Sequence, residues 1–246
     1  MWIDVVDLRD FYASPLGRVA RRVIGAHLRA LWPDVTGQAI LGLGYATPYL
    51  SYFRGEAGRV IAAMPARQGV VRWPSDGPGL TVLCDEADLP LPDLCVDRVI
   101  LIHALEFSEQ IRPLLREAWR VLGEGGRLLV VTPNRRGIWA RLERTPFGHG
   151  QPYSARQLSQ VLRENMFTPI RTRSGLFVPP SRSRMVLSSA RVFEGVGQRF
   201  FNVFSGVLAM EASKEIYAGQ LETETRRRHA LVTVPGGNPR SIPHAR

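Results

Sequence analysis

Cysteine is scarce in this sequence, and its two residues stand apart. The 246 residues include only Cys84 and Cys95, with no Cys-x-x-Cys spacing and no clustered histidines. This arrangement argues against a disulfide framework and against the usual zinc motifs, so we expect no metal site. Two free thiols are typical of a reducing compartment, and we therefore expect a cytoplasmic protein.

Long apolar runs are also missing. No stretch approaches the roughly 20 consecutive apolar residues that span a bilayer, so we expect no transmembrane segment. The first ten residues, MWIDVVDLRD, are acidic in balance and lack a basic leader region, so we expect no signal peptide. A phosphate-binding loop and a Ser-His-Asp arrangement are equally absent from the sequence.

Lysine is almost absent, because arginine supplies every basic side chain except Lys214. The charge is uneven: residues 1–123 carry a net charge of −1 and residues 124–246 a net charge of +11. The basic C-terminal half predicts an anionic or a protein partner, with nucleic acid and a membrane surface among the anionic ones. A solvated basic face without a partner is the other interpretation, because the arginines are spread out and lack interleaved aromatic residues.

Apolar periodicity predicts alternating strands and helices through most of the chain. We expect an amphipathic helix over residues 8–31 and a helix that begins with Thr47 as its N-cap and Pro48 at its first position. Further helices are expected over 113–122, over 154–165 with a capping box of Ser154 and Gln157, and over about 191–201. The expected strands cover residues 39–43, 59–64, 80–84, 96–102, 126–133, 168–175 and 206–214.

This alternation predicts an α/β fold with a doubly wound, mainly parallel sheet of seven strands and helices on both faces. We expect an N-terminal helical segment over residues 1–35 and the α/β domain over 36–216. A basic insertion over 176–205 precedes the last strand of that domain. The polar residues 217–246 predict a disordered basic tail.

The ends of the expected strands carry the residues that matter for function, because doubly wound sheets bind ligands outside the carboxyl ends of their strands. We therefore expect a cleft lined by Gly44 and Tyr45 after the first strand, Met64 at the end of the second, Asp85 after the third and His103 after the fourth.

Three segments, in this order, resemble the class I S-adenosylmethionine-dependent methyltransferases, in particular the methyltransferase type 11-like group. They are ILGLGYATPYL from Ile40, VLCDEADLPLPDLCVDRVILIHALEF from Val82 and LLREAWRVLGEGGRLLVVTPN from Leu114. The resemblance covers about residues 36–170. It implies a Rossmann-like methyltransferase fold and S-adenosylmethionine as cofactor, without a metal. It also implies a cofactor site formed by Gly42, Gly44, Tyr45, Met64, Asp85, Glu86 and His103.

The sequence departs from the family pattern where the ribose and the methionine tail of the cofactor are held. Gly42 stands in place of an acid, Ala46 and Pro48 replace glycines, and Met64 ends the second strand without a carboxylate. Each lost charge-assisted contact removes on the order of 1.5–3 kcal/mol, whereas Asp85 is retained for the adenine amino group. We therefore expect weak or lost cofactor binding, with a dissociation constant no tighter than roughly 100 μM.

The sequence leaves the catalytic residues open. His103 is a candidate base, and His149 and Tyr153 lie in a loop that could face a substrate, but a packing role is the alternative for all three. Methyl transfer needs mainly in-line positioning, so the lack of an obvious catalytic dyad does not argue against it. We expect methyl transfer to an unknown small-molecule or protein acceptor. The alternative is a catalytically inactive methyltransferase-fold protein that binds or regulates a partner.

Overall fold

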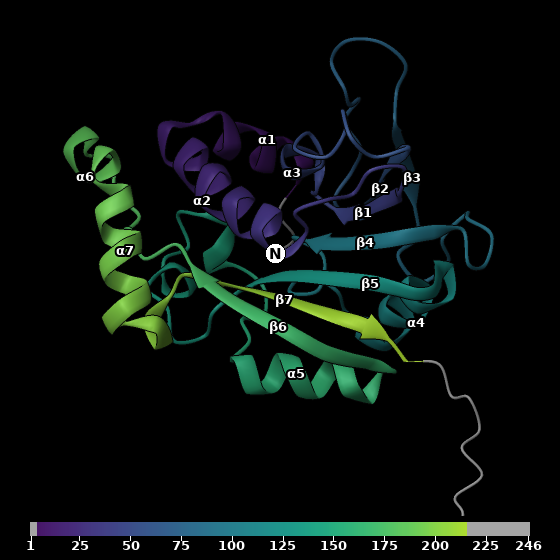
Figure 1. Cartoon of the computed structure of the whole chain (residues 1–246). Coiled ribbons are helices and arrows are strands. Elements are labelled where there is room, and N and C mark those ends of the chain that lie inside the picture. The colour runs from purple at the N-terminus through teal and green to yellow at the C-terminus, as the bar shows by residue number, and fades with distance from the viewer. Residues whose placement is uncertain (1–3, 216–246) are drawn as a thin grey trace, which may run out of the picture. The chain divides into compact units, whose positions relative to one another are not determined.

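The computed structural model describes residues 4–215, which form a seven-stranded sheet covered by helices (Figure 1). The strands are β1 Ala39–Gly44, β2 Arg59–Pro65, β3 Thr81–Cys84, β4 Val96–Ile102, β5 Leu122–Pro133, β6 Phe167–Gly175 and β7 Val207–Lys214. Their order is β3-β2-β1-β4-β5-β7-β6, with β7 antiparallel to both of its neighbours and the other pairs parallel. The predicted α/β class and the mainly parallel sheet are confirmed.

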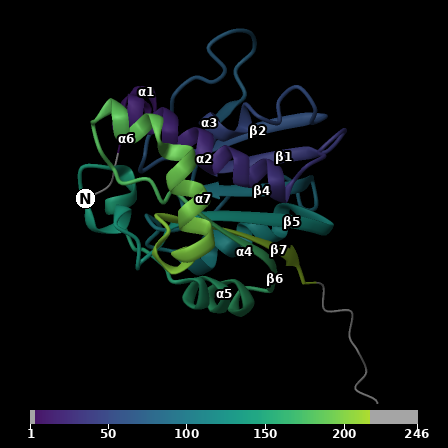
Figure 2. The ribbon, with the colours of Figure 1, turned by 60° about the vertical axis from the view of Figure 1, so that its left-hand side comes forward.

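Helices cover both faces of this sheet (Figures 1 and 2). They are α1 Val5–Ala13, α2 Pro15–Leu31, α3 Thr47–Leu50, α4 Ile111–Val121, α5 Ala155–Glu164, α6 Arg184–Ser188 and α7 Ala190–Phe200, with short 3-10 turns η1 Trp139–Arg141, η2 Pro146–Gly148 and η3 Asn202–Phe204. Each face has its own apolar core, because side chains alternate along a strand: Ile40 packs with α1 to α3, whereas Leu41 and Leu43 pack with α4 and α5.

The prediction of one helix over residues 8–31 is wrong, because the chain forms two helices that meet at Ser14 and Pro15. Ser14 is extended, as expected before a proline, and Pro15 has no N–H with which to continue α1. The Ser14 hydroxyl instead accepts a hydrogen bond from the Gly17 N–H at 3.0 Å and caps α2. The break lets α1 leave the direction of α2 and reach the carboxyl ends of the strands.

Other local predictions have mixed outcomes. The capping box of Ser154 and Gln157 is confirmed at the start of α5, whereas Ala46 rather than Thr47 occupies the N-cap position of α3. Helix α3 has only four residues, and no side chain caps its start. The predicted tail over 217–246 lies outside the described residues. Between residues 4 and 215, no helix is both long and apolar enough to cross a bilayer.

Candidate functional site

The carboxyl ends of β1, β2 and β4 bring most of the predicted site residues to one edge of the sheet. Gly44 pairs in register with Ile102, the last residue of β4, and His103 follows directly. Met64 lies near the end of β2, which neighbours β1 on the other side. Because β3 is one strand further away, the carboxylates that follow it stand at the margin of this group.

Gly44 makes the tight turn that leaves β1. Its φ is +85°, and a Cβ atom there would lie 2.3 Å from the Ile102 carbonyl oxygen, so only glycine fits. The next residue, Tyr45, donates its backbone N–H to that same carbonyl at 2.9 Å. The close approach to β4 therefore already explains the glycine.

The two positions without the family's acids are filled by packing. A Cβ atom at Gly42 would lie 2.7 Å from the Ala46 Cβ and 2.7 Å from a Leu50 methyl group, because α3 lies directly against β1. Met64 is buried, and its sulfur accepts a weak hydrogen bond from the Val71 N–H at 3.4 Å. There is no room for a carboxylate at Gly42 in this arrangement.

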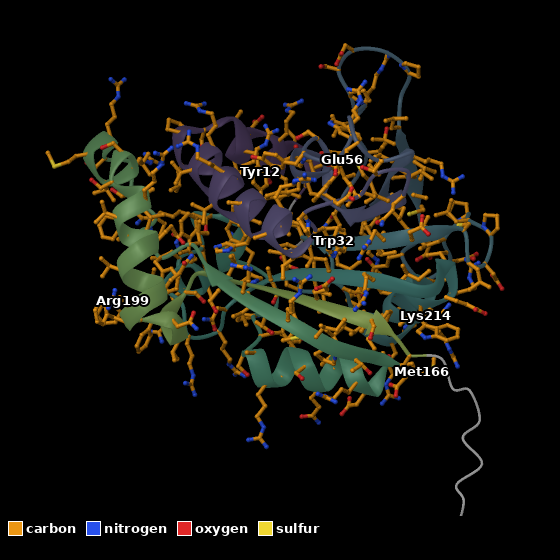
Figure 3. All side chains as sticks on the ribbon, viewed as in Figure 1. Tyr12, Trp32, Glu56, Met166, Arg199 and Lys214 are labelled. Atoms are coloured by element: carbon orange, nitrogen blue, oxygen red, sulfur yellow. The ribbon has the colours of Figure 1, made fainter. Side chains whose placement is uncertain are left out.

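Tyr12 is the residue that closes the site, although no pattern in the sequence points to it. It extends from α1 (Figure 3), and its hydroxyl lies 2.8 Å from His103 Nε2 and 2.9 Å from the Tyr49 hydroxyl. Its ring stacks on Tyr45 with centroids 5.7 Å apart and planes 20° apart. Burial raises the pKa of Tyr12 well above its usual value, so the phenol stays protonated.

His103 is fully buried and has an unusual backbone, with a φ of +51°. Its Nδ1 lies 3.2 Å from Glu106 Oε1, and its carbonyl oxygen accepts a hydrogen bond from the Gln68 side-chain amide. The second carboxylate oxygen of Glu106 is buried without a hydrogen-bond partner. Backbone strain next to an unpaired buried carboxylate oxygen is typical of functional sites.

Of the other two catalytic candidates, Tyr153 adjoins this cluster and His149 does not. The Tyr153 hydroxyl is buried without a partner, and burial together with the charge of Glu106 raises the pKa of Tyr153 to about 12. His149 is part of the loop after β5, where its Nε2 donates to the Glu143 carbonyl oxygen. Glu106 is not among the sequence-based candidates, although it lies in a segment that carries the family resemblance.

The acids after β3 remain accessible. Asp85 is exposed, and its carboxylate accepts a hydrogen bond from the Ala87 N–H at 2.9 Å. Glu86 is half-buried and accepts a hydrogen bond from the Ser108 hydroxyl at 2.6 Å, and burial raises the pKa of its carboxyl. In residues 4–215, no group of three or more His, Cys, Asp and Glu side chains could hold a metal ion.

A cavity of about 580 Å³ lies beside the buried cluster, between the N-terminal helices, the loop after β5 and α6. Phe11, Pro146 and Leu187 give it apolar walls, and several charged groups and His149 border it. The Phe147 ring separates this cavity from the strand ends, since its centroid lies 6.0 Å from that of Phe11 and 5.0 Å from that of His103.

Known proteins share the fold of this chain. Residues 41–130 match the model of the methyltransferase domain family. Residues 41–130 are therefore similar to a methyltransferase domain. A solved S-adenosylmethionine-dependent methyltransferase of Thermotoga maritima, a possible histamine N-methyltransferase, has the same fold, with a TM-score of 0.61, 15% identity and coverage of 86% of this chain and 96% of its own.

Two further matches extend this picture of the methyltransferase-like chain. The 1,6-didemethyltoxoflavin-N1-methyltransferase of Burkholderia thailandensis, solved with S-adenosylhomocysteine bound, has a TM-score of 0.54 at 15% identity over 85% of this chain and 83% of its own. An uncharacterized protein of Mycobacterium tuberculosis is 27% identical over 189 residues, which are 73% of this chain. The match covers 64% of the length of that relative.

Only the adenine part of the family's cofactor, S-adenosylmethionine, finds an open partner in this methyltransferase-like chain, at the residues that follow β3. Asp85 presents an open carboxylate for an adenine amino group. Tyr45, Met64 and His103, however, are only 5%, 1% and 0% exposed, because side chains of the protein itself cover them. With α1 in this position, the ribose and methionine parts find neither a charged partner nor open space, so the residues do not fit the whole cofactor.

Proposed function

We propose that this protein transfers a methyl group from S-adenosylmethionine to an acceptor, and that α1 must move before the cofactor binds. The family match and the fold support the activity. The observation that carries the second part is the Tyr12 hydroxyl, which bridges His103 and Tyr49 over the end of β4. The proposed cofactor-binding residues remain those of the strand ends: Gly42, Gly44, Tyr45, Met64, Asp85, Glu86 and His103.

The buried polar cluster supports a role for His103 in handling a proton. Its Nδ1 contacts Glu106, which fixes the ring, and its Nε2 loses its partner whenever Tyr12 withdraws. His103 would then have a free nitrogen to accept a proton from the acceptor. Tyr153, whose hydroxyl has no partner, is the second group that can hydrogen-bond an acceptor there.

The acceptor itself is proposed to enter through the cavity behind Phe147. A volume of about 580 Å³ lies within the range of small-molecule sites, and apolar walls with a few polar groups are typical of them. This favours a small molecule over a protein acceptor. His149 borders this cavity and is proposed as an acceptor contact rather than as a base.

A calorimetric titration of the full chain with S-adenosylmethionine tests this function. We expect the wild type to bind no tighter than roughly 100 μM, because the covered state leaves only a small competent fraction. The Tyr12→Ala variant removes the bridge and is expected to bind at least about tenfold tighter. Val6→Ala, on the exposed side of the same helix, is the matched control and should leave affinity unchanged.

Two outcomes would contradict parts of the proposal. Low-micromolar binding by the wild type would show that α1 does not cover the site in solution. No binding by either protein would contradict methyl transfer itself. It would support the second candidate, which is a methyltransferase-fold protein that works without the cofactor as a binding or regulatory partner. The hydrogen bonds of the Tyr12 hydroxyl to Tyr49 and His103 favour this candidate, because they occupy the site with the protein's own groups.

We also propose a partner and a cellular location for the protein. The basic C-terminal half is proposed to bind an anionic or a protein partner, because most of the excess positive charge lies there. A reducing, cytoplasmic location is proposed from Cys84 and Cys95, which are both free thiols.

A further inference from the structure

The segment 184–204, which contains α6, α7 and η3 and is called the arm below, exposes an unusual amount of apolar surface. It stands at one end of the sheet on the side of α2 (Figures 1 and 2). Its outward apolar side chains are between 46% and 79% exposed: Met185, Val192, Val196, Phe200, Phe201 and Phe204. Contiguous apolar patches on soluble proteins commonly mark a surface that binds something.

The exposed face of α7 is not the face by which the helix packs on the protein. Ala190, Glu194 and Gly197, spaced by four and three residues, form the inner side. A Cβ atom at Gly197 would lie 2.1 Å from the Phe177 ring, which shows how closely the helix approaches the body. The side chains of Val192 and Val196 lie on the opposite side of α7 and are 67% and 46% exposed.

The charge of the arm is one-sided. Arg184, Arg191 and Arg199 are exposed, and Arg182 lies two residues before the arm. The one acid in this stretch, Glu194, turns inward, where its carboxylate accepts backbone N–H groups of Leu176 and Phe177 at 3.0 and 2.6 Å.

The outward field of the arm is therefore positive. None of the ion pairs found between residues 4 and 215 involves these four arginines. Arg199 points away from the sheet (Figure 3), with its guanidinium carbon 5.7 Å from the centre of the Phe200 ring.

We propose that the arm binds the surface of an anionic lipid bilayer. Phenylalanines and aliphatic side chains beside arginines, with no outward acid, have the composition of helices that lie in the interface of a membrane. A protein partner of mixed charge would leave several arginines unpaired, whereas anionic headgroups match all of them. The proposal concerns the outward face of the arm and does not depend on the proposed methyl transfer.

Co-sedimentation of the full chain with lipid vesicles tests this inference. We expect binding to vesicles of phosphatidylcholine mixed with phosphatidylglycerol, weaker binding at high salt, and little binding to phosphatidylcholine alone. The double variant Arg191→Glu with Arg199→Glu should lose at least roughly 30-fold in partitioning, because each arginine near an anionic surface contributes about fivefold. Phe200→Ser with Phe204→Ser should also lose binding, since it removes the apolar contact.

A matched control uses two exposed arginines of α5. Arg156→Glu with Arg163→Glu makes the same change in net charge on another element and should bind vesicles like the wild type. The substituted side chains are all exposed, so melting temperatures should stay close to that of the wild type.

Three outcomes would overturn the proposal. One is equal binding to vesicles with and without phosphatidylglycerol, and another is an equal loss of binding in the α5 control. In the third outcome, the wild type does not bind vesicles but forms a dimer, and the double variant Phe200→Ser with Phe204→Ser is a monomer. That result would make the arm an interface between two copies of the chain.

Discussion

Removing the hydroxyl of Tyr12 is the most direct way to test whether the bridge over the strand ends forms in solution. Tyr12→Phe keeps the ring, its stacking on Tyr45 and its volume. It removes only the two hydrogen bonds, of 2.8 Å to His103 and of 2.9 Å to Tyr49. The change therefore isolates the polar part of the contact between α1 and the end of β4.

The expected cost follows from what the substitution leaves behind. His103 Nε2 and the Tyr49 hydroxyl stay buried, since both residues are 0% exposed, and each loses its partner. An unsatisfied buried polar group costs about 1–3 kcal/mol, so two of them should lower the free energy of unfolding by about 2–6 kcal/mol. For a chain of this size, the melting temperature should fall by about 4–24 °C.

Urea denaturation followed by tryptophan fluorescence measures this change. We expect a lower midpoint with an unchanged slope, because the surface exposed on unfolding hardly differs. Tyr52→Phe is the control, because Tyr52 is 39% exposed and should change stability by less than about 0.5 kcal/mol. If Tyr12→Phe is as stable as this control, the bridge does not form in solution and the proposed cover of the site is wrong.

Three further predictions concern other parts of the site. Gly42→Asp should lower the free energy of unfolding by about 3 kcal/mol or more, because the new side chain would clash with Ala46 and Leu50 and bury a charge. It should not improve cofactor affinity; urea denaturation measures the first effect and calorimetry the second. Burial raises the pKa of the Glu86 carboxyl, so the folded state binds its proton more tightly than the unfolded state does. Stability therefore falls as the pH rises through and above the usual glutamate range, and Glu86→Gln should flatten the profile of urea midpoint against pH there. Burial also raises the pKa of the Cys84 thiol to about 11. Cys84 should therefore react slowly with a thiol reagent at about pH 8 in the folded protein and rapidly after unfolding, and mass spectrometry of the labelled peptide measures both rates.

Strong local signals in the sequence were sufficient for much of the fold. The apolar run Val96–Ile102 is a strand with the predicted bounds because it is buried between two neighbouring strands and needs no further information. The capping box of Ser154 likewise fixes the start of α5 within a few residues. The break at Ser14 was missed, although Pro15 is visible in the sequence, because the apolar stripe continues across both helices.

The site was less predictable, because its defining contacts join residues that are distant in the chain. His103 was recognised as the end of a strand, but Tyr12 lies 91 positions before it, and no local pattern links the two. Glu106 carries a signal, since an acid three residues after a strand-end histidine can reach back to the ring. Its buried, unpaired oxygen is a property of packing that no sequence pattern contains.

The departures from the family pattern also acquire a different meaning once their surroundings are known. In the sequence, Gly42 and Met64 are two losses of a carboxylate. In the structure, Leu50 packs against Gly42, the Met64 sulfur accepts a backbone N–H, and Tyr12 bonds to His103 at the end of β4. The protein's own groups therefore occupy each of these positions. Restoring one acid would therefore not restore a cofactor site, whereas displacing Tyr12 tests directly whether a site remains beneath it.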